Sequence, residues 1–161
     1  MLSEKVKSIT EIKNIAEYIR RRKKRIVFTN GCFDILHYGH AKYLESAKQK
    51  GDYLILGLNS DSSIRRIKGR SRPIVSQGDR AGLISALTSV DFVVIFNEDT
   101  PLNLIKKVRP DILVKGADWN KQDIVGASFV KSYGGRVETV KLVKGLSTTK
   151  LIKKIVKTLK S

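Results

Sequence analysis

The feature that most constrains the fold is the segment 26–49, in which a short apolar run leads through a turn into a helical pattern. Residues 26–28 are apolar and mostly β-branched, which is typical of a short buried strand. Asn30 and Gly31 predict a turn, and the apolar residues of 41–47 recur at helical spacing. The segment therefore predicts a strand whose carboxyl end leads into the amino end of a helix, which is where open α/β sheets bind ligands.

The two histidines of the chain, His37 and His40, both stand at this junction. Residues three apart at a helix start lie on the same side of its first turn, and the free N–H groups and dipole of that turn favour phosphate. Gly39 lacks a side chain, so an anion can approach the backbone between the histidines. The alternatives are a helix cap beside a packed histidine, or a zinc site for which only carboxylates remain to complete the ligand set. Because strand, turn, histidine pair and helix agree in order, the pattern favours a phosphate site.

Length and composition limit the class of protein. The chain has 161 residues, of which 41% are hydrophobic, so we expect a single domain with a buried core. It has no apolar run of about 18 residues and begins without an apolar signal segment, so we expect neither a membrane span nor secretion. Its one cysteine, Cys32, excludes an internal disulfide and fits a reducing cytoplasm. We interpret Cys32 as a small buried thiol rather than a nucleophile.

The charge is strongly basic, with a net charge of +17. Residues 20–25 are all basic, and the segment from Lys141 to Ser161 holds seven lysines and no acid. Three readings fit this charge: nucleic-acid binding, attraction of small anions such as nucleoside triphosphates, or a solvated lysine-rich surface. The absence of an RNA-binding aromatic pattern and of zinc-finger spacing favours the last two, so we do not expect nucleic acid as a partner.

Apolar periodicity predicts the remaining elements. Ile12, Ile15, Ala16 and Ile19 fall on one face of a helix over 9–24, which we expect only to pack. The further strands are expected at 53–58, 91–96, 110–114 and 136–140, with helices within 62–67, 77–89, 97–107 and 124–133 and after 147. We therefore predict an α/β, Rossmann-like fold with a five-stranded, mostly parallel sheet and helices on both faces. Residues 1–161 would form one domain, in which the packing helix precedes a core of about 25–157.

Polar residues follow the second strand and the helices after it. Asp61 either caps the next helix or reaches a ligand. Lys68 opens a basic loop with glycine and proline, which is a candidate phosphate contact, although a solvated loop would have a similar composition. Arg80 lies in the first turn of a helix and is either part of the site or an exposed surface residue.

The fourth strand leads into Lys115 and Gly116, which are followed by Asp118 and Trp119. Asp118 is a candidate to accept from a ribose hydroxyl or to hold an acceptor, and Trp119 is a candidate to cover a sugar or a base. The alternative is a glycine turn with a packed tryptophan.

A run of hydroxyl residues, 147–149, opens the last helix. One N-cap needs only one hydroxyl, so the run favours a second phosphate cradle at a helix amino end. Ordinary capping by Ser147 is the alternative.

At these positions the sequence resembles the cytidylyltransferase-like nucleotidyltransferases, whose His-x-Gly-His tetrad corresponds to residues 37–40. Over about 26–155 it looks most like the heptose 1-phosphate adenylyltransferases, which occur alone or as the carboxyl half of a bifunctional kinase/adenylyltransferase. The chain is too short to include the kinase, which we expect on another polypeptide. The segments that carry the resemblance are 30–40, 59–61, 68–73, 98–101, 113–116 and 147–149.

The resemblance implies transfer of AMP from ATP to a sugar 1-phosphate, D-glycero-D-manno-heptose 1-phosphate, by a cytoplasmic prokaryotic enzyme. It implies Mg²⁺ bound with ATP, no metal held by the protein alone, a homodimer, and no membrane partner. Catalytic roles would fall to His37, His40 and Lys68, and substrate contacts to Asp61, Arg80, Asp118 and Trp119. Nucleotide contacts would fall to Asn30, Gly31, Phe33, Asp34, Gly39, Lys115, Gly116, Ser147, Thr148 and Thr149.

Two alternative functions and the identity of one binding residue remain open. Asp118 and Trp119 also resemble the cytidylyltransferase branch, which would use CTP and glycerol 3-phosphate or a similar phospho-alcohol. Lys144 stands where some relatives carry arginine, a better bidentate partner for phosphate, so the residue that grips the triphosphate is left open. The non-enzyme alternative is a basic module that binds nucleic acid through 20–25 and the C-terminal lysines.

Overall fold

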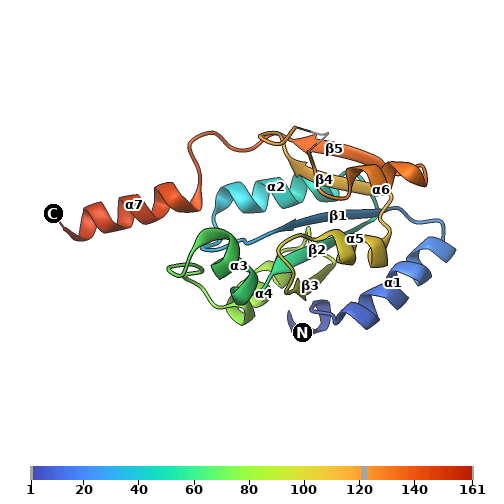
Figure 1. Ribbon diagram of the computed structural model, residues 1–161, viewed down its shortest axis with the longest axis horizontal. Helices are drawn as coiled ribbons and strands as arrows, with labels where there is room; N and C mark the ends of the chain where they lie inside the picture. Colours follow the sequence, from blue (N-terminus) through green and yellow to red (C-terminus); the bar gives the residue numbers. More distant parts are fainter. Residues whose placement is uncertain (1, 121–122, 161) are drawn as a thin grey trace.

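The computed structural model describes residues 2–120 and 123–160, and its centre is a sheet of five parallel strands (Figure 1). The strand order is β3-β2-β1-β4-β5, and every pairing between these strands is parallel. The predicted Rossmann-like class is confirmed, with an all-parallel sheet in place of a mostly parallel one. The strands are β1 (Ile26–Gly31), β2 (Tyr53–Asn59), β3 (Phe92–Phe96), β4 (Ile112–Gly116) and β5 (Arg136–Val140).

Helices cover both faces of this sheet, because successive strand residues point to opposite sides. On one face, Ile26 and Phe28 pack with apolar residues of α1, α5 and α6. On the other face, Val27 packs with apolar residues of α2 and α4. The helices are η1 (a 3-10 turn, Leu2–Lys5), α1 (Ile9–Arg21), α2 (Tyr38–Lys48), α3 (Asp61–Lys68), α4 (Gln77–Ser85), α5 (Leu102–Val108), α6 (Ala127–Ser132) and α7 (Thr148–Leu159).

The packing helix α1 begins with a capping box, in which Ser8 Oγ accepts from the Glu11 amide and the Glu11 carboxylate accepts from the Ser8 amide. Its buried residues Ile12, Ala16 and Ile19 lie in the same core as the sheet. The helix ends at Arg21 rather than at the predicted residue 24. Lys23 has a φ of 55°, which is left-handed and interrupts the helical backbone there.

The chain order places a crevice beside β1. From β1 the chain builds outward through β2 and β3, and it then returns to the other side of β1 for β4 and β5. The carboxyl ends of β1 and β4 therefore lie next to each other at a topological switch point, where open α/β sheets bind ligands. The amino ends of α2 and α7 approach the same edge, and the rest of α7 extends away from the body (Figure 1).

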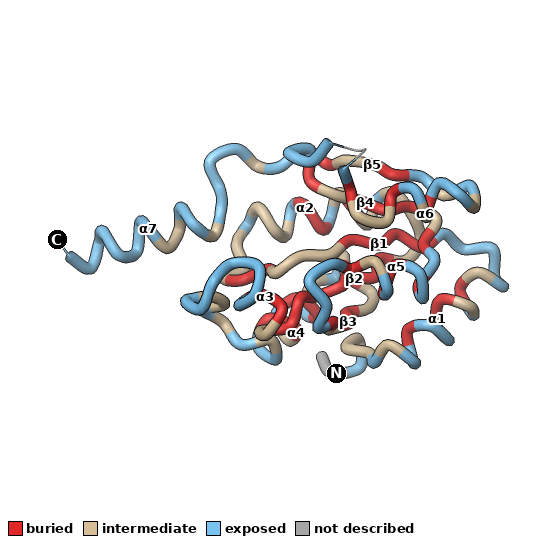
Figure 2. The backbone as a smooth tube through the Cα atoms, viewed as in Figure 1, coloured by how far each residue is buried: buried red, intermediate tan, exposed pale blue. Residues whose placement is uncertain are grey.

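Burial follows the same plan. The strands are largely buried and the outer helix faces are exposed, whereas α7 is exposed or half-buried along its whole length (Figure 2). In the described part of the chain, no helix combines the length and apolar character that crossing a membrane requires.

Replacing Ile12 by alanine tests the packing of α1. Ile12 is fully buried, so the cavity left by Ile12→Ala should lower the free energy of unfolding by about 2–4 kcal/mol. The neighbouring variant Lys13→Ala changes an exposed residue and should cost less than about 0.5 kcal/mol. Urea unfolding followed by circular dichroism measures both, and equal costs would contradict the packing of α1 on the sheet.

Candidate active site

A cavity of about 370 Å³ occupies the crevice between the carboxyl ends of β1 and β4. Its walls come from the loop after β1, the start of α2, the basic loop after α3, the end of β4 and the segment that leads into α7. The lining residues are Asn30, Gly31, Cys32, Phe33, Asp34, His37, Gly39, His40, Tyr43, Lys68, Arg72, Lys115, Gly116, Asp118, Trp119, Leu142, Val143, Leu146, Ser147, Thr148 and Thr149. The tertiary structure therefore brings together all the predicted site residues except Asp61 and Arg80.

The histidine pair lies at the amino end of α2. His37 is the N-cap residue but makes no side-chain cap hydrogen bond, so the predicted alternative of a capping histidine is wrong. The imidazole rings of His37 and His40 stack with their centroids 3.8 Å apart and their planes 19° apart. Phe33 packs against His40 at a centroid distance of 5.1 Å. The ring positions are thus fixed by packing rather than by hydrogen bonds to the protein.

Four buried polar atoms at this point have no hydrogen-bond partner among the described residues: both ring nitrogens of His37, Nδ1 of His40 and Oδ1 of Asn30. Buried polar groups are nearly always paired in native proteins, so such a cluster calls for an explanation. A ligand rich in oxygen atoms and hydroxyls would supply the missing partners. This cluster is therefore the strongest structural sign of a binding site in the chain.

Burial keeps both histidines neutral. The pKa of His40 is lowered to about 4, mainly by burial and further by His37 and Lys68, while Asp34 acts in the opposite direction. Burial also lowers the pKa of His37. Each neutral ring carries one N–H donor and one acceptor nitrogen. A bound anion would favour the protonated forms of both histidines, and the two positive charges would then help to bind it.

Gly39 is required by the histidine packing. A Cβ at this position would lie 3.0 Å from Cε1 of His37 and 3.4 Å from Cβ of Leu146. Both contacts are tight, so a side chain here would displace either the catalytic candidate His37 or the segment that leads into α7. The small residue therefore permits a close approach of ring and backbone, as well as of an anion.

The Asp34 carboxylate holds the basic loop in place through hydrogen bonds and an ion pair. The side chain of Asp34 is 1% exposed, and its carboxylate accepts from Arg72 Nε at 2.8 Å and from the amides of Ile74 and Val75 at 2.9 Å. Burial alone would raise the pKa of Asp34, but the two amides and Arg72 lower it, and the net pKa is lowered. Asp34 thus stays ionised and holds the loop that carries Arg72 and that follows Lys68, the last residue of α3.

The opposite wall carries a half-buried lysine, Lys115. Lys115 Nζ donates to the carbonyl of Asn30 at 3.3 Å and lies 5.6 Å from the ring centroid of Trp119. Burial lowers the pKa of Lys115 to about 8, although Cys32 and Asp118 act to raise it. Lys68, Arg72 and Lys115 outnumber the two acidic residues of the lining, Asp34 and Asp118, and this excess of basic side chains suits a polyphosphate.

The start of α7 forms the outer wall. Ser147 caps the helix and accepts from the Lys150 amide at 3.2 Å, as the capping alternative predicts. Thr148 Oγ1 donates to the carbonyl of Asp34 at 2.8 Å. These bonds leave the free amides of the first turn at the cavity, where they are available to phosphate. Lys144 is exposed and does not line the cavity.

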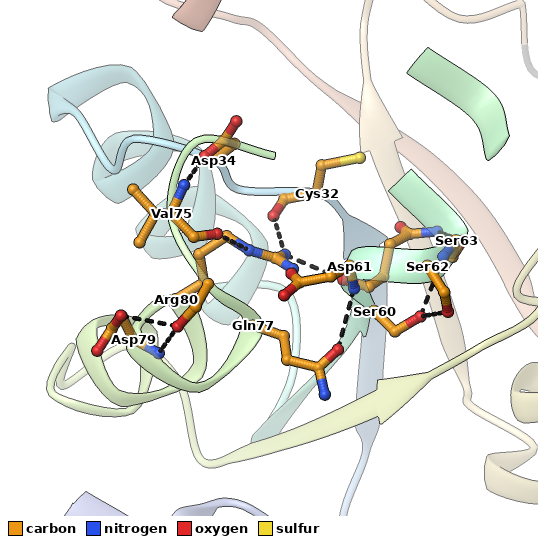
Figure 3. Close-up of polar contacts among 12 residues, drawn as sticks. Cys32, Asp34, Ser60, Asp61, Ser62, Ser63, Val75, Gln77, Asp79 and Arg80 are labelled. Carbon is orange, nitrogen blue, oxygen red and sulfur yellow. Dashed lines mark hydrogen bonds and ion pairs between the residues drawn. The ribbon is translucent and has the colours of Figure 1, made fainter. Parts of the chain in front are cut away.

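Arg80 and Asp61 do not line the cavity. Figure 3 shows the side chain of Arg80 between Cys32, Val75 and Asp61. The guanidinium of Arg80 donates to the carbonyls of Cys32 at 2.6 Å, Asn59 at 3.0 Å and Val75 at 3.0 Å, and to Asp61 Oδ1 at 2.7 Å. Arg80 is 1% exposed, so its interpretation as a surface arginine is wrong. The arginine ties the loop after β1 to the segments after β2 and before α4. Direct substrate contact by Asp61 or Arg80 stays a prediction.

The cysteine and the described carboxylates give no metal centre. The part of the chain that the structure describes contains no group of three His, Cys, Asp or Glu side chains that could hold a metal ion. Cys32 is partly exposed at the cavity wall, and burial raises the pKa of its thiol, which disfavours a nucleophilic thiolate.

Sequence reasoning missed Arg72, Tyr43 and three apolar lining residues, Leu142, Val143 and Leu146. Arg72 lies in the basic loop that Lys68 opens, but its partner Asp34 is 38 positions away, so no local pattern singles it out. The apolar residues precede the hydroxyl run and have no helical or strand periodicity. Their position just before the hydroxyl run at 147–149 was the one feature of the sequence that could have indicated that they lie near the cavity.

The comparison with protein families agrees with this geometry. Residues 28–155 match the Cytidylyltransferase-like family, and the chain belongs to this family. It is 55% identical over 151 residues to the bifunctional protein HldE of Syntrophotalea carbinolica and 56% identical over 151 residues to that of Campylobacter curvus. These matches cover 94% of this chain but 31% of each relative, so the chain spans under a third of their length.

Two solved structures share the fold. The lipopolysaccharide core biosynthesis protein from Thermoplasma volcanium has a TM-score of 0.62 and 32% identity, and the match covers 75% of this chain and 98% of that one. The pantoate-β-alanine ligase from Francisella tularensis has a TM-score of 0.61 at 15% identity, covering 97% of this chain and 79% of that one. The second likeness concerns the fold alone.

Titration of the histidines tests their burial. In ¹H NMR spectra, with His37→Gln used to assign the two ring signals, His40 should titrate near pH 4 and His37 below its ordinary value near 6.5. The unfolded chain then binds more protons than the folded chain between about pH 4 and 6.5, so the free energy of unfolding should rise with pH across that window. Added pyrophosphate should raise both pKa values. A His40 pKa at or above 6.5 in the free protein would contradict the burial of the ring nitrogens.

Replacing Asp34 tests the clamp on the basic loop. Asp34→Asn leaves Arg72 without its anion and turns an amide group towards two backbone N–H donors, so it should lower the free energy of unfolding by about 2–4 kcal/mol. The control Asp99→Asn breaks an ion pair with Arg66 whose acid is 57% exposed, and it should cost less than about 1 kcal/mol. The expected difference between the variants disappears if Asp34 does not hold the loop.

Proposed function

We propose that the chain is a nucleotidyltransferase that moves AMP from ATP to D-glycero-D-manno-heptose 1-phosphate and gives ADP-heptose and pyrophosphate. The observation that carries this proposal is the stacked pair of His37 and His40, with unpartnered ring nitrogens, in a cavity with an excess of basic side chains at a helix amino end. Membership of the Cytidylyltransferase-like family supports the reaction class. Identity above 50% to the HldE proteins supports the heptose acceptor.

In the proposed reaction, a phosphate oxygen of the acceptor attacks the α-phosphorus of ATP in line. The new P–O bond forms as the bond between the α-phosphorus and the bridging oxygen breaks, and pyrophosphate leaves. Such a transfer needs no covalent enzyme intermediate, so the task of the protein is to position the reactants and to stabilise the developing charge.

Each wall of the cavity has a part in this task. His37 and His40 donate to oxygens of the α-phosphate and of the leaving group, and they gain protons as the anion raises their pKa values. Lys68 and Arg72 bind the polyphosphate from the end of α3 and the basic loop, and the amino end of α7 with Ser147–Thr149 binds it from the other side. Asn30 and Lys115 meet the nucleotide beside β1, and Asp118 and Trp119 meet its sugar or the acceptor.

Magnesium is expected to arrive with the triphosphate. Mg²⁺ is usually held by one or two carboxylates together with substrate phosphates and water, so the lack of a three-ligand cluster among the described residues fits this mode. Asp34 is engaged by Arg72 and two amides, which leaves Asp118 as the lining carboxylate available to a metal. The ion would neutralise charge on the phosphates.

A cytidylyltransferase that uses CTP and a phospho-alcohol is the second candidate, and Asp118 with Trp119 in the cavity wall is the observation that favours it. The chemistry would be the same with a different base and acceptor. For either activity we propose a homodimer in the cytoplasm, and a nucleic-acid-binding module is not favoured because it gives no account of the unpartnered histidine nitrogens.

Pyrophosphate release tests the proposal. Purified chain with Mg²⁺ and D-glycero-D-manno-heptose 1-phosphate should release pyrophosphate with ATP and much less with CTP. His37→Ala and His40→Ala should each lower kcat/KM by about 100- to 10,000-fold. Tyr38→Ala is the matched control, because Tyr38 adjoins His37 on α2, is 65% exposed and does not line the cavity. It should keep nearly full activity, and thermal unfolding curves should show that all three variants fold.

Other results would revise the proposal in different ways. Release with CTP and glycerol 3-phosphate alone would select the second candidate. Release that survives both histidine changes would remove the histidines from the chemistry. No release with either nucleotide across both acceptors would overturn the assignment as a nucleotidyltransferase.

A further inference from the structure

The C-terminal helix α7 carries an apolar stripe whose distal residues are left exposed by the described part of the chain. The stripe consists of Leu151, Ile152, Ile155, Val156 and Leu159, whose spacing places them on one side of the helix. None of the α7 residues is buried. Exposure rises along the stripe, since Ile155 is 44% exposed, Val156 46% and Leu159 81%, while the first two residues are half-buried (Figure 2).

The opposite side of α7 is entirely cationic. It consists of Lys150, Lys153, Lys154, Lys157 and the adjoining Lys160, all of them exposed, and the helix has no acidic residue. These lysines recur three and four positions apart, where like charges repel and destabilise a helix. A 12-residue helix is marginal in water by itself and normally depends on packing of its apolar face. The helix therefore combines a partly exposed apolar face with unneutralised charge.

We propose that α7 is an interfacial helix that binds an anionic membrane surface, with its apolar stripe immersed among the lipids and its lysines at the headgroups. Apolar residues on one face with lysines on the other are the composition of helices that lie in a membrane interface. A cluster of four to eight basic residues on such a helix is a recognised means of binding anionic lipid. The proposal departs from the expectation of no membrane partner, and it is independent of the proposed function.

Charge complementarity selects this partner over two others. A second copy of the chain could cover the stripe, but two apolar faces packed together would leave both lysine faces without an anionic partner. A nucleic acid duplex would neutralise the lysines but leave the apolar stripe in water. An anionic lipid interface satisfies both faces at once, because the stripe enters the acyl boundary while lysine side chains reach the headgroups.

The arrangement of the chain leaves the helix free to bind in this way. Thr148 holds the amino end of α7 to the cavity wall through its bond to Asp34, and the rest of the helix extends away from the body (Figure 1). The most exposed stripe residue, Leu159, is at the far end of the helix. The distal turns of the helix therefore lie away from the body (Figure 1).

Vesicle co-sedimentation with the full chain tests the proposal. The chain should bind vesicles of phosphatidylglycerol and phosphatidylcholine in equal parts, and it should bind phosphatidylcholine vesicles at least about ten-fold more weakly. Lys154→Gln with Lys157→Gln should weaken partitioning about 25-fold, because each lysine near an anionic surface contributes roughly five-fold. Ile155→Ser with Leu159→Ser should weaken it by at least about ten-fold.

Matched controls separate α7 from the general basic charge. Lys106→Gln with Lys107→Gln makes the same charge change on exposed residues of α5, and Leu83→Ser removes a leucine that is 52% exposed on α4. Both controls should bind anionic vesicles nearly as the parent does. Circular dichroism should show a gain of helix on anionic vesicles in the parent but not in the Ile155/Leu159 variant.

Three outcomes would overturn the proposal. If vesicle binding falls equally in the α5 control and the α7 lysine variant, the binding depends on the net charge of the chain and not on α7. A second copy of the chain would be the partner of the stripe if two results were found together. The parent would not bind vesicles, and the Ile155/Leu159 variant would lose self-association in sedimentation velocity without lipid. Binding to duplex DNA that needs the lysines but not the stripe, without vesicle binding, would make the partner nucleic acid. None of these readouts depends on nucleotidyl transfer.

Discussion

The architecture of the cavity depends on one buried carboxylate. Asp34 accepts from Arg72 and from two amides of the basic loop, while its own carbonyl accepts from Thr148 at the start of α7. Three chain segments that are far apart in sequence thus meet at a single residue after β1. Burying a charge is costly unless it is paired and hydrogen-bonded, and here each carboxylate oxygen has such partners. Without them the loop after Lys68 and the first turn of α7 would have no common anchor.

The cavity combines fixed positive charge with two groups that acquire it. Arg72 is paired with Asp34, while Lys115 has a lowered pKa because of partial burial, and the two histidines are neutral for the same reason. A fully charged cluster of this density would repel itself in the free protein. Neutral histidines reduce that repulsion and leave nitrogen atoms unpartnered until an anion arrives. The histidines thus become positively charged when the ligand binds, and they lie where the negative charge of the leaving phosphate group needs stabilisation.

Rigidity and exposure are distributed unequally over the molecule. Arg80 fixes the backbone around it through three carbonyls and Asp61 (Figure 3), and the β1–β4 crevice is built on buried strands. At the other side of the cavity, α7 belongs to the site only through its first turn. None of its residues is buried, and its pattern of lysines and aliphatic residues is the one that we propose binds an anionic lipid interface.

Local patterns in the sequence predict most of the elements and the centre of the site. The strand and the helix on either side of the histidine pair, the other apolar strands and the helix after Ser147 all form, because periodicity records which face of an element is buried. The turn predicted at Asn30 and Gly31 is wrong, since both residues belong to β1. The tertiary structure sets which distant residues meet. It joins Asp34 to Arg72, places Leu142, Val143 and Leu146 at the cavity, and leaves Asp61 and Arg80 outside its lining. These contacts, the lowered histidine pKa values and the exposed stripe of α7 depend on strand order and on burial by remote segments, which no local pattern encodes.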